Sequence, residues 1–375
     1  MNKEIQIRQA VPGDAGQLAD LAKRGMPGYP FESVYDPSAL KIEIASGIDR
    51  IVVEDSDKNI RGTAVLGEGY MAEIKRVLVD PDLRKHHLGQ GLTDNLKMKA
   101  IKKGVIPWAD VRADQIGMQK AAHAYDLRLY PISVEAGKHV VYAHKNDSGP
   151  ARESMVHMSG LSLAQSTNEL NSTMCKWSNN YVRRLVDNMA DSLVSQDKDI
   201  DLVKSVLPSA SIVKDRIEKN IQRRGLAHTQ LTPDIIALSN NDARCIIISP
   251  DASGFVEGGD SKSIISLVDL GLDLGLQIVT CYLPVENIAL INELISSGMQ
   301  PAMVRPWQLS AKDSPRWEVG LRKTANHYEK SLHTLNLDTW VYAGILSVIQ
   351  GIDSTINMWA GYYRGNPKDM GGCII

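Results

Sequence analysis

Residues 71–95 read MAEIKRVLVDPDLRKHHLGQGLTDN, and the rest of the chain is interpreted outward from them. The first nine of these residues alternate in polarity and are rich in β-branched types, which predicts a β-strand. An Asp-Pro pair ends that strand, because proline cannot donate a hydrogen bond to a sheet ladder. A basic loop follows and contains Gly89 and Gly91. From Leu92 apolar residues recur at helical spacing, which predicts an amphipathic helix ending at Gly104.

A glycine loop between a strand and a helix favours the binding of a phosphate or a diphosphate. Backbone N–H groups at a helix N-terminus have no partner within the helix, and the helix dipole favours negative charge there. Glycine allows the backbone to approach a ligand closely. The spacing excludes two common phosphate loops. No Gly-Lys-Ser/Thr ends the loop as in a P-loop, and no third glycine completes a Rossmann fingerprint.

In sequence this stretch resembles the acetyl-CoA loop of the GNAT superfamily of N-acyltransferases. The resemblance is carried by Val79-Asp80-Pro81 and by the run from His86 to Gly91. The family usually has Arg or Gln where this chain has His86, which is a departure from the pattern. Strands predicted over 4–9, 50–55, 60–66 and 106–113, with a last hairpin over 129–134 and 139–143, follow the order of a complete GNAT domain.

The resemblance implies that the chain uses acetyl-CoA or another acyl-CoA as a co-substrate. In a GNAT domain the fourth and fifth strands separate, and the pantetheine lies against free backbone groups of the fourth strand. By resemblance these are the backbone groups of Val77 and Val79. The diphosphate then falls to the backbone amides of His87, Leu88, Gly89, Gln90, Gly91 and Leu92.

Two residues are the candidates for proton transfer. Glu73 lies on the same strand, and an acid on an apolar central strand is costly to bury without a role or a partner. It is the candidate base, acting through water; the alternatives are an ion pair with Lys75 or Arg76, or plain exposure to solvent. The family's general acid is a tyrosine on the helix after the fifth strand. Tyr125 is the nearest match, although Ala124 occupies the usual position.

The sequence gives less information about the residues that would bind the acceptor. Residues 28–37 form a loop dense in aromatic residues, which either covers the acceptor or plugs the core. Glu32 and Asp36 in this loop are candidates to hold a cationic acceptor. The loop histidines His86 and His87 are interpreted as phosphate contacts rather than bases.

The second half of the chain reads as an internal duplication of the first. Two helices, over 168–193 and 212–224, lead to a hairpin and then to the progression strand, helix, strand, helix, strand. Where a donor loop would stand, the chain has acids, and Asp260 or Ser261 is expected to cap the helix that follows. This half is therefore expected to be a degenerate copy that buries the open face of the first. Trp307 and Trp317 either line an acceptor pocket or pack in the core.

Composition sets outer bounds on the function. The chain has 375 residues, which suits two domains, and its net charge of −2 gives no electrostatic case for a nucleic-acid partner. No apolar run reaches the length of a membrane span, and the first residues do not open a signal peptide, so we expect no membrane and a cytoplasmic location. Four scattered cysteines favour neither a metal site nor a disulfide framework.

These observations predict an α/β (α+β) protein of two tandem acyl-CoA N-acyltransferase (GNAT-like) domains, each a mixed twisted sheet flanked by helices. The predicted units are a GNAT acyl-CoA-binding domain over 1–146, a helical connector over 147–226, a degenerate GNAT-like domain over 227–324 and a C-terminal helical segment over 325–375.

The predicted activity is transfer of an acyl group, by direct attack and without a metal, to a primary amine of a small-molecule acceptor. A homodimer is left open. One rival is a non-catalytic acyl-CoA sensor or scaffold. Another is a transferase using aminoacyl-tRNA, which the near-neutral charge disfavours.

Overall fold

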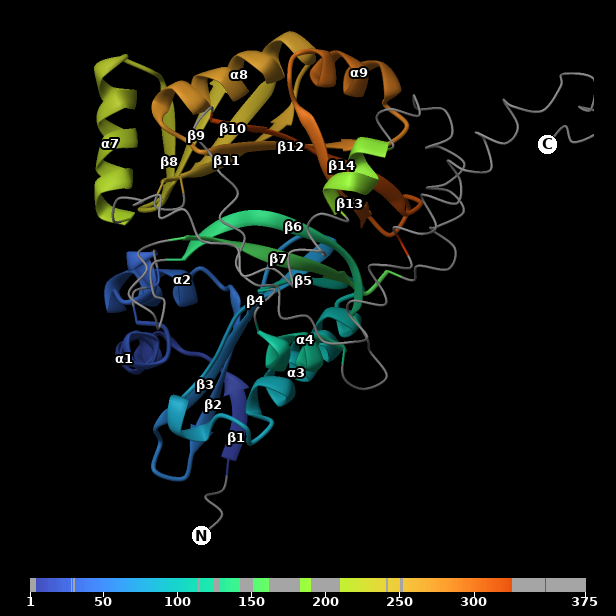
Figure 1. Cartoon of the computed structure of the whole chain (residues 1–375). Helices are drawn as coiled ribbons and strands as arrows, with labels where there is room; N and C mark the ends of the chain where they lie inside the picture. Colours follow the sequence, from blue (N-terminus) through green and yellow to red (C-terminus); the bar gives the residue numbers. More distant parts are fainter. Residues whose placement is uncertain are drawn as a thin grey trace, which may run out of the picture.

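The structure of this chain is a computed structural model. It describes residues 5–27, 29, 31–112, 115–123, 129–141, 151–161, 183–189, 210–240, 242–249, 252–325 and 348. In these residues the chain forms two seven-stranded mixed sheets with helices packed on them (Figure 1). The expected α/β class with two tandem sheets is confirmed.

The first sheet has the strand order β1-β2-β3-β4-β5-β7-β6. Its strands are β1 (Ile5–Gln9), β2 (Asp49–Asp55), β3 (Ile60–Leu66), β4 (Met71–Val79), β5 (Ile106–Arg112), β6 (Tyr130–Val141) and β7 (Ala151–Ser159). All neighbours are antiparallel except β4 and β5, which are parallel.

Helices cover both faces of this sheet. The described α-helices on it are α1 (Ala15–Gly25), α2 (Pro37–Ala45), α3 (Leu88–Lys102) and α4 (Ile116–His123). Val52 of β2 packs in the cluster with α1 and α2. Its neighbours Ile51 and Val53 pack in the cluster with α3, because successive strand residues point to opposite faces. The sheet therefore has an α1/α2 face and an α3 face.

The second sheet has the strand order β8-β9-β10-β11-β12-β14-β13. Its elements in chain order are α7 (Ala210–Arg223), β8 (His228–Thr232), β9 (Ile235–Asn240), β10 (Ala243–Ile248), β11 (Ser253–Gly258), α8 (Ser261–Leu274), β12 (Ile278–Pro284), α9 (Ile288–Ser296), β13 (Gln300–Trp307) and β14 (Arg316–Thr324). The pair β11–β12 is parallel and the other neighbours are antiparallel.

The two sheets share one topology, strand for strand. In each, the fourth and fifth strands are parallel and joined by a helix, and the last strand in sequence inserts beside the fifth. This agreement supports the predicted internal duplication. The halves differ at one point: two helices separate β1 from β2, whereas β8 turns directly into β9. The second half therefore lacks a counterpart of α1 and α2 at that position.

Two expected elements differ in the structure. The predicted hairpin over 129–134 and 139–143 is wrong, because β6 runs unbroken to Val141 and pairs instead with β7 at Ala151–Ser159. The helix predicted from Leu92 begins four residues earlier, at Leu88. The glycines stand in its first turn, and glycine weakens the helical signal of a sequence.

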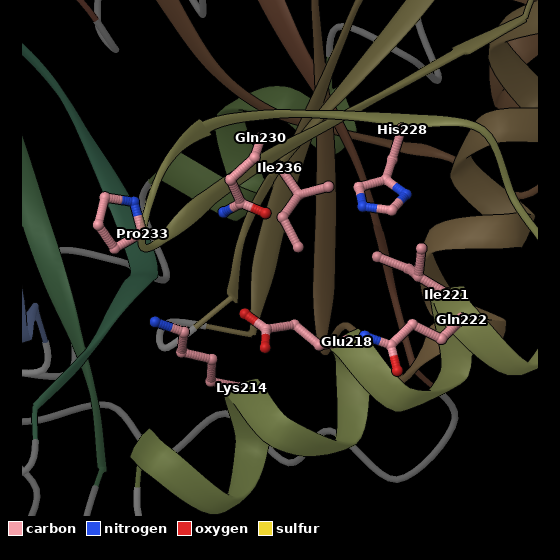
Figure 2. A pocket seen from close by; sticks show the side chains of 8 residues that line it. All are labelled: Lys214, Glu218, Ile221, Gln222, His228, Gln230, Pro233 and Ile236. Atoms are coloured by element: carbon pink, nitrogen blue, oxygen red, sulfur yellow. The ribbon is translucent and has the colours of Figure 1, made fainter.

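A shallow hollow of about 240 Å³ lies between α7 and the β8–β9 hairpin (Figure 2). Its lining comes from the second half alone: Lys214, Glu218, Ile221, Gln222, His228, Gln230, Pro233 and Ile236. Beside it, Asp234 is buried and pairs with Lys214 at 3.2 Å. The hollow is separate in sequence and in fold from residues 71–95.

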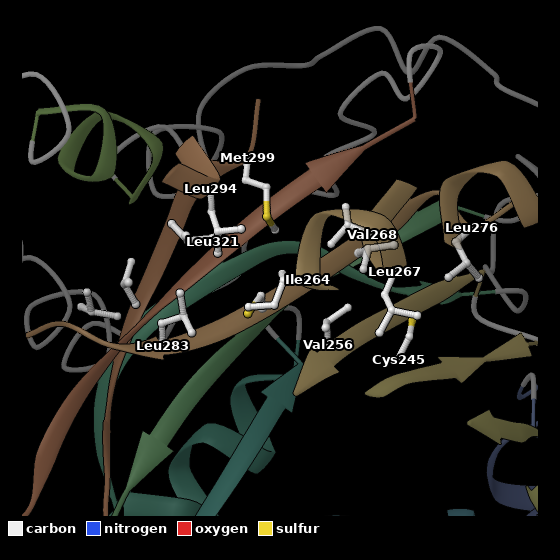
Figure 3. Close-up of a cluster of buried hydrophobic side chains, with 14 of the residues drawn as sticks. Cys245, Val256, Ile264, Leu267, Val268, Leu276, Leu283, Leu294, Met299 and Leu321 are labelled. Atoms are coloured by element: carbon white, nitrogen blue, oxygen red, sulfur yellow. The ribbon is translucent and has the colours of Figure 1, made fainter. Parts of the chain in front are cut away.

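One hydrophobic core joins the two halves. The cluster that fills the space beneath α8 and α9 (Figure 3) also contains Ile132 of β6 and Val156 of β7. The hydroxyl of Ser133 donates to the carbonyl of Val304 on β13 at 2.8 Å. The second half therefore packs on the β6–β7 side of the first sheet.

Parts of the expected organisation lie outside the described residues. These are most of the helix over 168–193 and almost all of the C-terminal segment over 325–375, so the bounds of the four predicted units stay predictions. The predicted connector over 147–226 contains β7 and α7. No described helix is both long enough and apolar enough to cross a membrane.

Candidate functional site

The parallel strands β4 and β5 pair over only three residues and then separate. Met71, Ala72 and Glu73 pair with Ile106, Pro107 and Trp108, and both strands, described in full, have no further pairing with each other. On its other side β4 stays paired to β3 up to Val79. This fork, defined here as β4 from Ile74 to Val79 and the facing part of β5, leaves backbone groups of β4 without a neighbouring strand.

The alternation of the antiparallel ladder shows which groups face the fork. The N–H of Asp80 donates to the carbonyl of Arg61 at 2.8 Å, which makes these two residues a hydrogen-bonded pair. Hydrogen-bonded and non-hydrogen-bonded pairs alternate along such a ladder. The backbone N–H and C=O of Val79 therefore point away from β3, toward the fork. By the same count Val77 points there too, next to an irregularity in β4.

That irregularity is a β-bulge. Between the pairs Thr63–Leu78 and Val65–Lys75 the strand β4 has one residue more than β3. Arg76 takes a positive φ of 52°, which non-glycine residues rarely adopt. A bulge re-aims the side chains around it. Lys75 and Arg76 consequently both lie on the α1/α2 face, where Arg76 reaches Glu43 of α2.

Helix α3 begins at the open end of the fork. His87 takes a left-handed conformation with a φ of 59° and no side chain caps the helix; its Nδ1 lies 3.1 Å from the Oε1 of Gln90. The loop side chains from Arg84 to His87 are exposed. The first amides of the helix, from Leu88 to Gln90, have no acceptor within the helix.

The structure leaves fewer of the predicted backbone amides available to bind a diphosphate. The N–H of Gly91 donates to the carbonyl of His87 at 2.9 Å, so it is already engaged. Leu92 is fully buried one turn into the helix, where its N–H has a helical partner. His87, Leu88, Gly89 and Gln90 remain as candidates.

Nothing in the fold itself requires glycine at positions 89 and 91. Both have helical rather than positive φ angles. A Cβ added at Gly89 would lie 3.7 Å from the Cγ2 of Val79, and one at Gly91 would lie 3.8 Å from the Cδ1 of Ile7. Both distances are ordinary van der Waals contacts. Glycine within a helix costs about 0.5–1 kcal/mol relative to alanine, and no internal contact explains that cost.

Glu73 lies at the apex of the fork and is part of an ion pair. Its Oε2 is 3.7 Å from the Nζ of Lys75, and its side chain is 29% exposed. The ion pair that the sequence left as an alternative is therefore present, and Glu73 remains accessible to solvent. Tyr125, the predicted acid, lies outside the described residues.

Three residues near Glu73 were missed by the sequence reasoning. Trp108 is in register with Glu73, and Asp110 follows on the same face of β5. The Nδ1 of His157 on β7 lies 3.1 Å from Asp110 Oδ1; the His157 side chain is buried, and that of Asp110 is 9% exposed. The ring of Trp108 lies 5.2 Å from that of His157 and 6.0 Å from that of Trp307.

Of these, only the alternation of β5 was visible beforehand. The strand β7 was not predicted, and its residues are far from β5 in sequence. Trp307 brings the second half to the edge of the site, whereas Trp317 is buried in the core.

The aromatic loop before α2 packs as a plug. Tyr29, Phe31 and Tyr35 pack on the α1/α2 cluster, and the hydroxyl of Tyr35 donates to the carbonyl of Met26. Asp36 accepts the N–H of Ser38 at 2.8 Å and so caps α2. Its carboxylate is engaged in capping, which weighs against the suggested role in holding a cationic acceptor.

The helix of the second half that corresponds to α3 is α8, and its N-terminus is capped. The carboxylate of Asp260 accepts the N–H of Ser263 at 2.8 Å and caps α8, as predicted. Gly258 and Gly259 before it have positive φ angles of 69° and 85°. An acid thus occupies the place where a diphosphate would be held.

Among proteins of known structure, part of this chain is similar to acetyltransferases. One is the ribosomal-protein-S18-alanine N-acetyltransferase from Escherichia coli, with 17% identity, a TM-score of 0.34, and 42% of this chain and 92% of that chain covered. Another is an acetyltransferase of the GNAT family from Streptococcus pneumoniae, with 12% identity, a TM-score of 0.35, and 42% and 98% covered.

An N-acetyltransferase from Staphylococcus aureus gives 16% identity, a TM-score of 0.34, and 42% and 97% covered. No protein-family model matches the chain, and no curated protein matches it in sequence.

Proposed function

We propose that this chain is an acyl-CoA-dependent N-acyltransferase whose donor lies in the fork between β4 and β5. The observation that carries the proposal is the pair Gly89 and Gly91 in the uncapped first turn of α3. The fold does not need glycine there, because the nearest side chains would leave room for a Cβ at either position. A ligand that approaches the backbone closely gives these glycines a reason, and helix N-termini favour diphosphates.

The fork supports the rest of the donor. The backbone groups of Val77 and Val79 face the gap. If α3 holds the diphosphate of an acyl-CoA, the amide-bearing pantetheine arm would lie along these groups. The thioester would then lie toward the apex, near Glu73. In the transfer the amine nitrogen forms a C–N bond, the thioester C–S bond breaks, and the amine loses a proton. Glu73 is proposed to accept that proton through water.

Tyr125 is proposed as the acid that protonates the leaving thiolate. We further propose that the acceptor is a small-molecule amine and that the donor is acetyl-CoA. We also propose that no metal takes part and that the protein is cytoplasmic. Nucleic acid and membrane are not proposed as partners.

The proposal is tested first by calorimetric titration of the protein with CoA, which should bind once per chain. Mass spectrometry of a cell extract incubated with the protein and isotopically labelled acetyl-CoA should then reveal a labelled amide. Absence of CoA binding would overturn the proposal.

The role of Glu73 is tested by Glu73→Gln. This change should lower kcat by about 10²–10⁴-fold while leaving the Kd for CoA unchanged. Glu68→Gln, an exposed acid in the loop before β4, is the matched control and should change neither.

A second candidate function is a non-catalytic acyl-CoA sensor. The ion pair between Glu73 and Lys75 favours it, because a carboxylate held by an ammonium is a weaker base. CoA binding without turnover on any amine in the extract would support the sensor over the enzyme.

A further inference from the structure

Two arginines on the α1/α2 face converge on one carboxylate. Arg50 of β2 donates to Glu43 Oε1 at 2.6 Å, and Arg76 in the bulge of β4 pairs with Glu43 Oε2. Arg50 also lies 3.4 Å from the hydroxyl of Thr63. The cluster therefore ties α2 to three neighbouring strands, β2, β3 and β4, on the side of the sheet opposite α3.

The charges of this cluster do not balance. Arg50 is only 3% exposed, and its buried Nε has no hydrogen-bond partner among the described residues. Arg50 and Arg76 share the one carboxylate of Glu43, whereas the partly exposed pair Glu73–Lys75 on the same face is balanced in itself. Burying an uncompensated charge is costly. Among the described residues, the cluster of Arg50, Glu43 and Arg76 therefore lacks one negative charge.

The pKa of Glu43 agrees with this excess. Burial alone would raise the pKa of its carboxyl, but the charges of Arg76 and Arg50 hold that pKa below its usual value. Glu43 is thus ionised and fully used by its two partners.

Arg76 is placed where an acceptor would meet the fork. Its side chain is 31% exposed, and its described ion pair uses a single nitrogen, Nη1. The bulge puts it beside Lys75, three residues along β4 from Glu73. A guanidinium presents paired donors that match a carboxylate.

Resting on the proposed function, we infer that the acceptor is an amino acid or a related small amine that carries a carboxylate, and that Arg76 binds this carboxylate while the amine reaches the apex of the fork. A carboxylate carries the single negative charge that the cluster lacks. The alternative is that the cluster serves only to tie α2 to the sheet.

The experiment compares acids with their carboxamides. Glycine, β-alanine, 6-aminohexanoate and L-lysine are each paired with the corresponding amide and titrated into the protein, with and without saturating CoA, by calorimetry. Where acetyl-CoA is consumed, kcat/KM is measured for both members of each pair. At least one acid should bind about tenfold or more tightly than its amide, as expected for a charge-assisted bond.

Variants separate recognition from structure. Arg76→Gln should remove the preference for the acid while leaving binding of the amide unchanged, and Arg76→Lys should retain part of it. Arg61→Gln is the matched control, because Arg61 is a half-buried arginine of β3 whose two carboxylate partners, Asp55 and Asp80, leave no excess charge. It should keep the full preference.

Three results would overturn the inference: no acid binds, acids and amides bind alike, or Arg76→Gln weakens both alike. Failure of CoA to bind would count against the proposed function alone, since the comparison of acid with amide on the free protein still decides the role of Arg76.

Discussion

Gly89 is a glycine that the fold does not require, so a substitution of this one residue can test the proposed donor site. The position is the second of helix α3, it is half-buried, and an added Cβ would meet only an ordinary contact at 3.7 Å. Alanine or glutamate would suit the free helix better than glycine, and glutamate would also favour the helix dipole. Stability and ligand binding should therefore respond to substitution in opposite directions.

We expect Gly89→Glu to keep or raise the Tm and to weaken CoA binding by at least about 100-fold, because a carboxylate would face the diphosphate. Gly117→Glu is the control: Gly117 is also the second residue of a helix, α4, with no heavy atom near its Cβ position. Its Kd for CoA should match the unsubstituted protein. Equal loss of binding in both variants would contradict the site.

The acidic residues around Arg61 predict how stability varies with pH. Burial alone would raise the pKa of Asp55, but the amide of Asn59 and the guanidinium of Arg61 hold that pKa well below its usual range. Burial alone would also raise the pKa of Asp80. The amide of Asp82 and the guanidinium groups of Arg61 and Arg24 favour its charged form, and the pKa of Asp80 is lowered. Groups with lowered folded-state pKa values stabilise the fold above their unfolded pKa of about 4, and lose this effect as pH falls.

The free energy of unfolding should therefore fall between pH 5 and pH 2, as measured by urea titration at each pH. Arg61→Gln should reduce this fall. Lys23→Gln, which breaks only the exposed pair with Asp20, should leave it unchanged. A pH dependence identical in the Arg61 variant would refute the assignment.

At the scale of elements, the two equivalent helices α3 and α8 differ at their N-termini. Each follows the fourth strand of its sheet. No side chain caps α3, whereas Asp260 caps α8. A helix end that is capped by its own chain has fewer amides to offer a ligand. The two halves thus share the same fold, but of the two equivalent helices only α3 has an N-terminus without a side-chain cap.

Asp260→Ala should lower the Tm by about 2 °C through loss of the cap and leave CoA binding unchanged. Asp260→Asn retains a capping side chain and should stay close to the original Tm. A change in the number of CoA molecules bound per chain in the alanine variant would contradict this reading of α8.

At the scale of the whole molecule, the two sheets share a core rather than a mere contact. Ile132 of β6 is fully buried in the same cluster as Val304 of β13, and the Ser133–Val304 hydrogen bond crosses between the halves. Trp307 extends this contact to Trp108 beside the fork. We expect the halves to unfold together.

A single thermal transition should therefore be seen by both circular dichroism and tryptophan fluorescence. Ile132→Ala should lower the free energy of unfolding by about 2–5 kcal/mol and shift both signals equally. Ile101→Ala, at an exposed isoleucine of α3, should change it by less than about 0.5 kcal/mol. Two transitions, with only one sensitive to Ile132→Ala, would show that the halves are independent.

Much of the fold was readable from local patterns. The strand β4, the end of helix α3 shortly before Gly104, the β2–β3 hairpin and the cap at Asp260 all follow from periodicity and from residue types within a few positions. The duplication was visible because the same progression recurs after Gly275. Each of these features depends on neighbours in sequence, which is where a sequence carries its strongest structural signal.

The rest was decided only by tertiary structure. Insertion of β7 beside β5 brings His157 to Asp110 across 47 positions of sequence, and the bulge at Arg76 turns two consecutive side chains to one face. No local pattern encodes either event, because strand pairing and register depend on which faces the assembled sheet buries. By itself, therefore, the sequence determined most of the local elements and a predicted donor loop, while the insertion of β7 and the meeting of Arg50, Glu43 and Arg76 required the sheet to assemble.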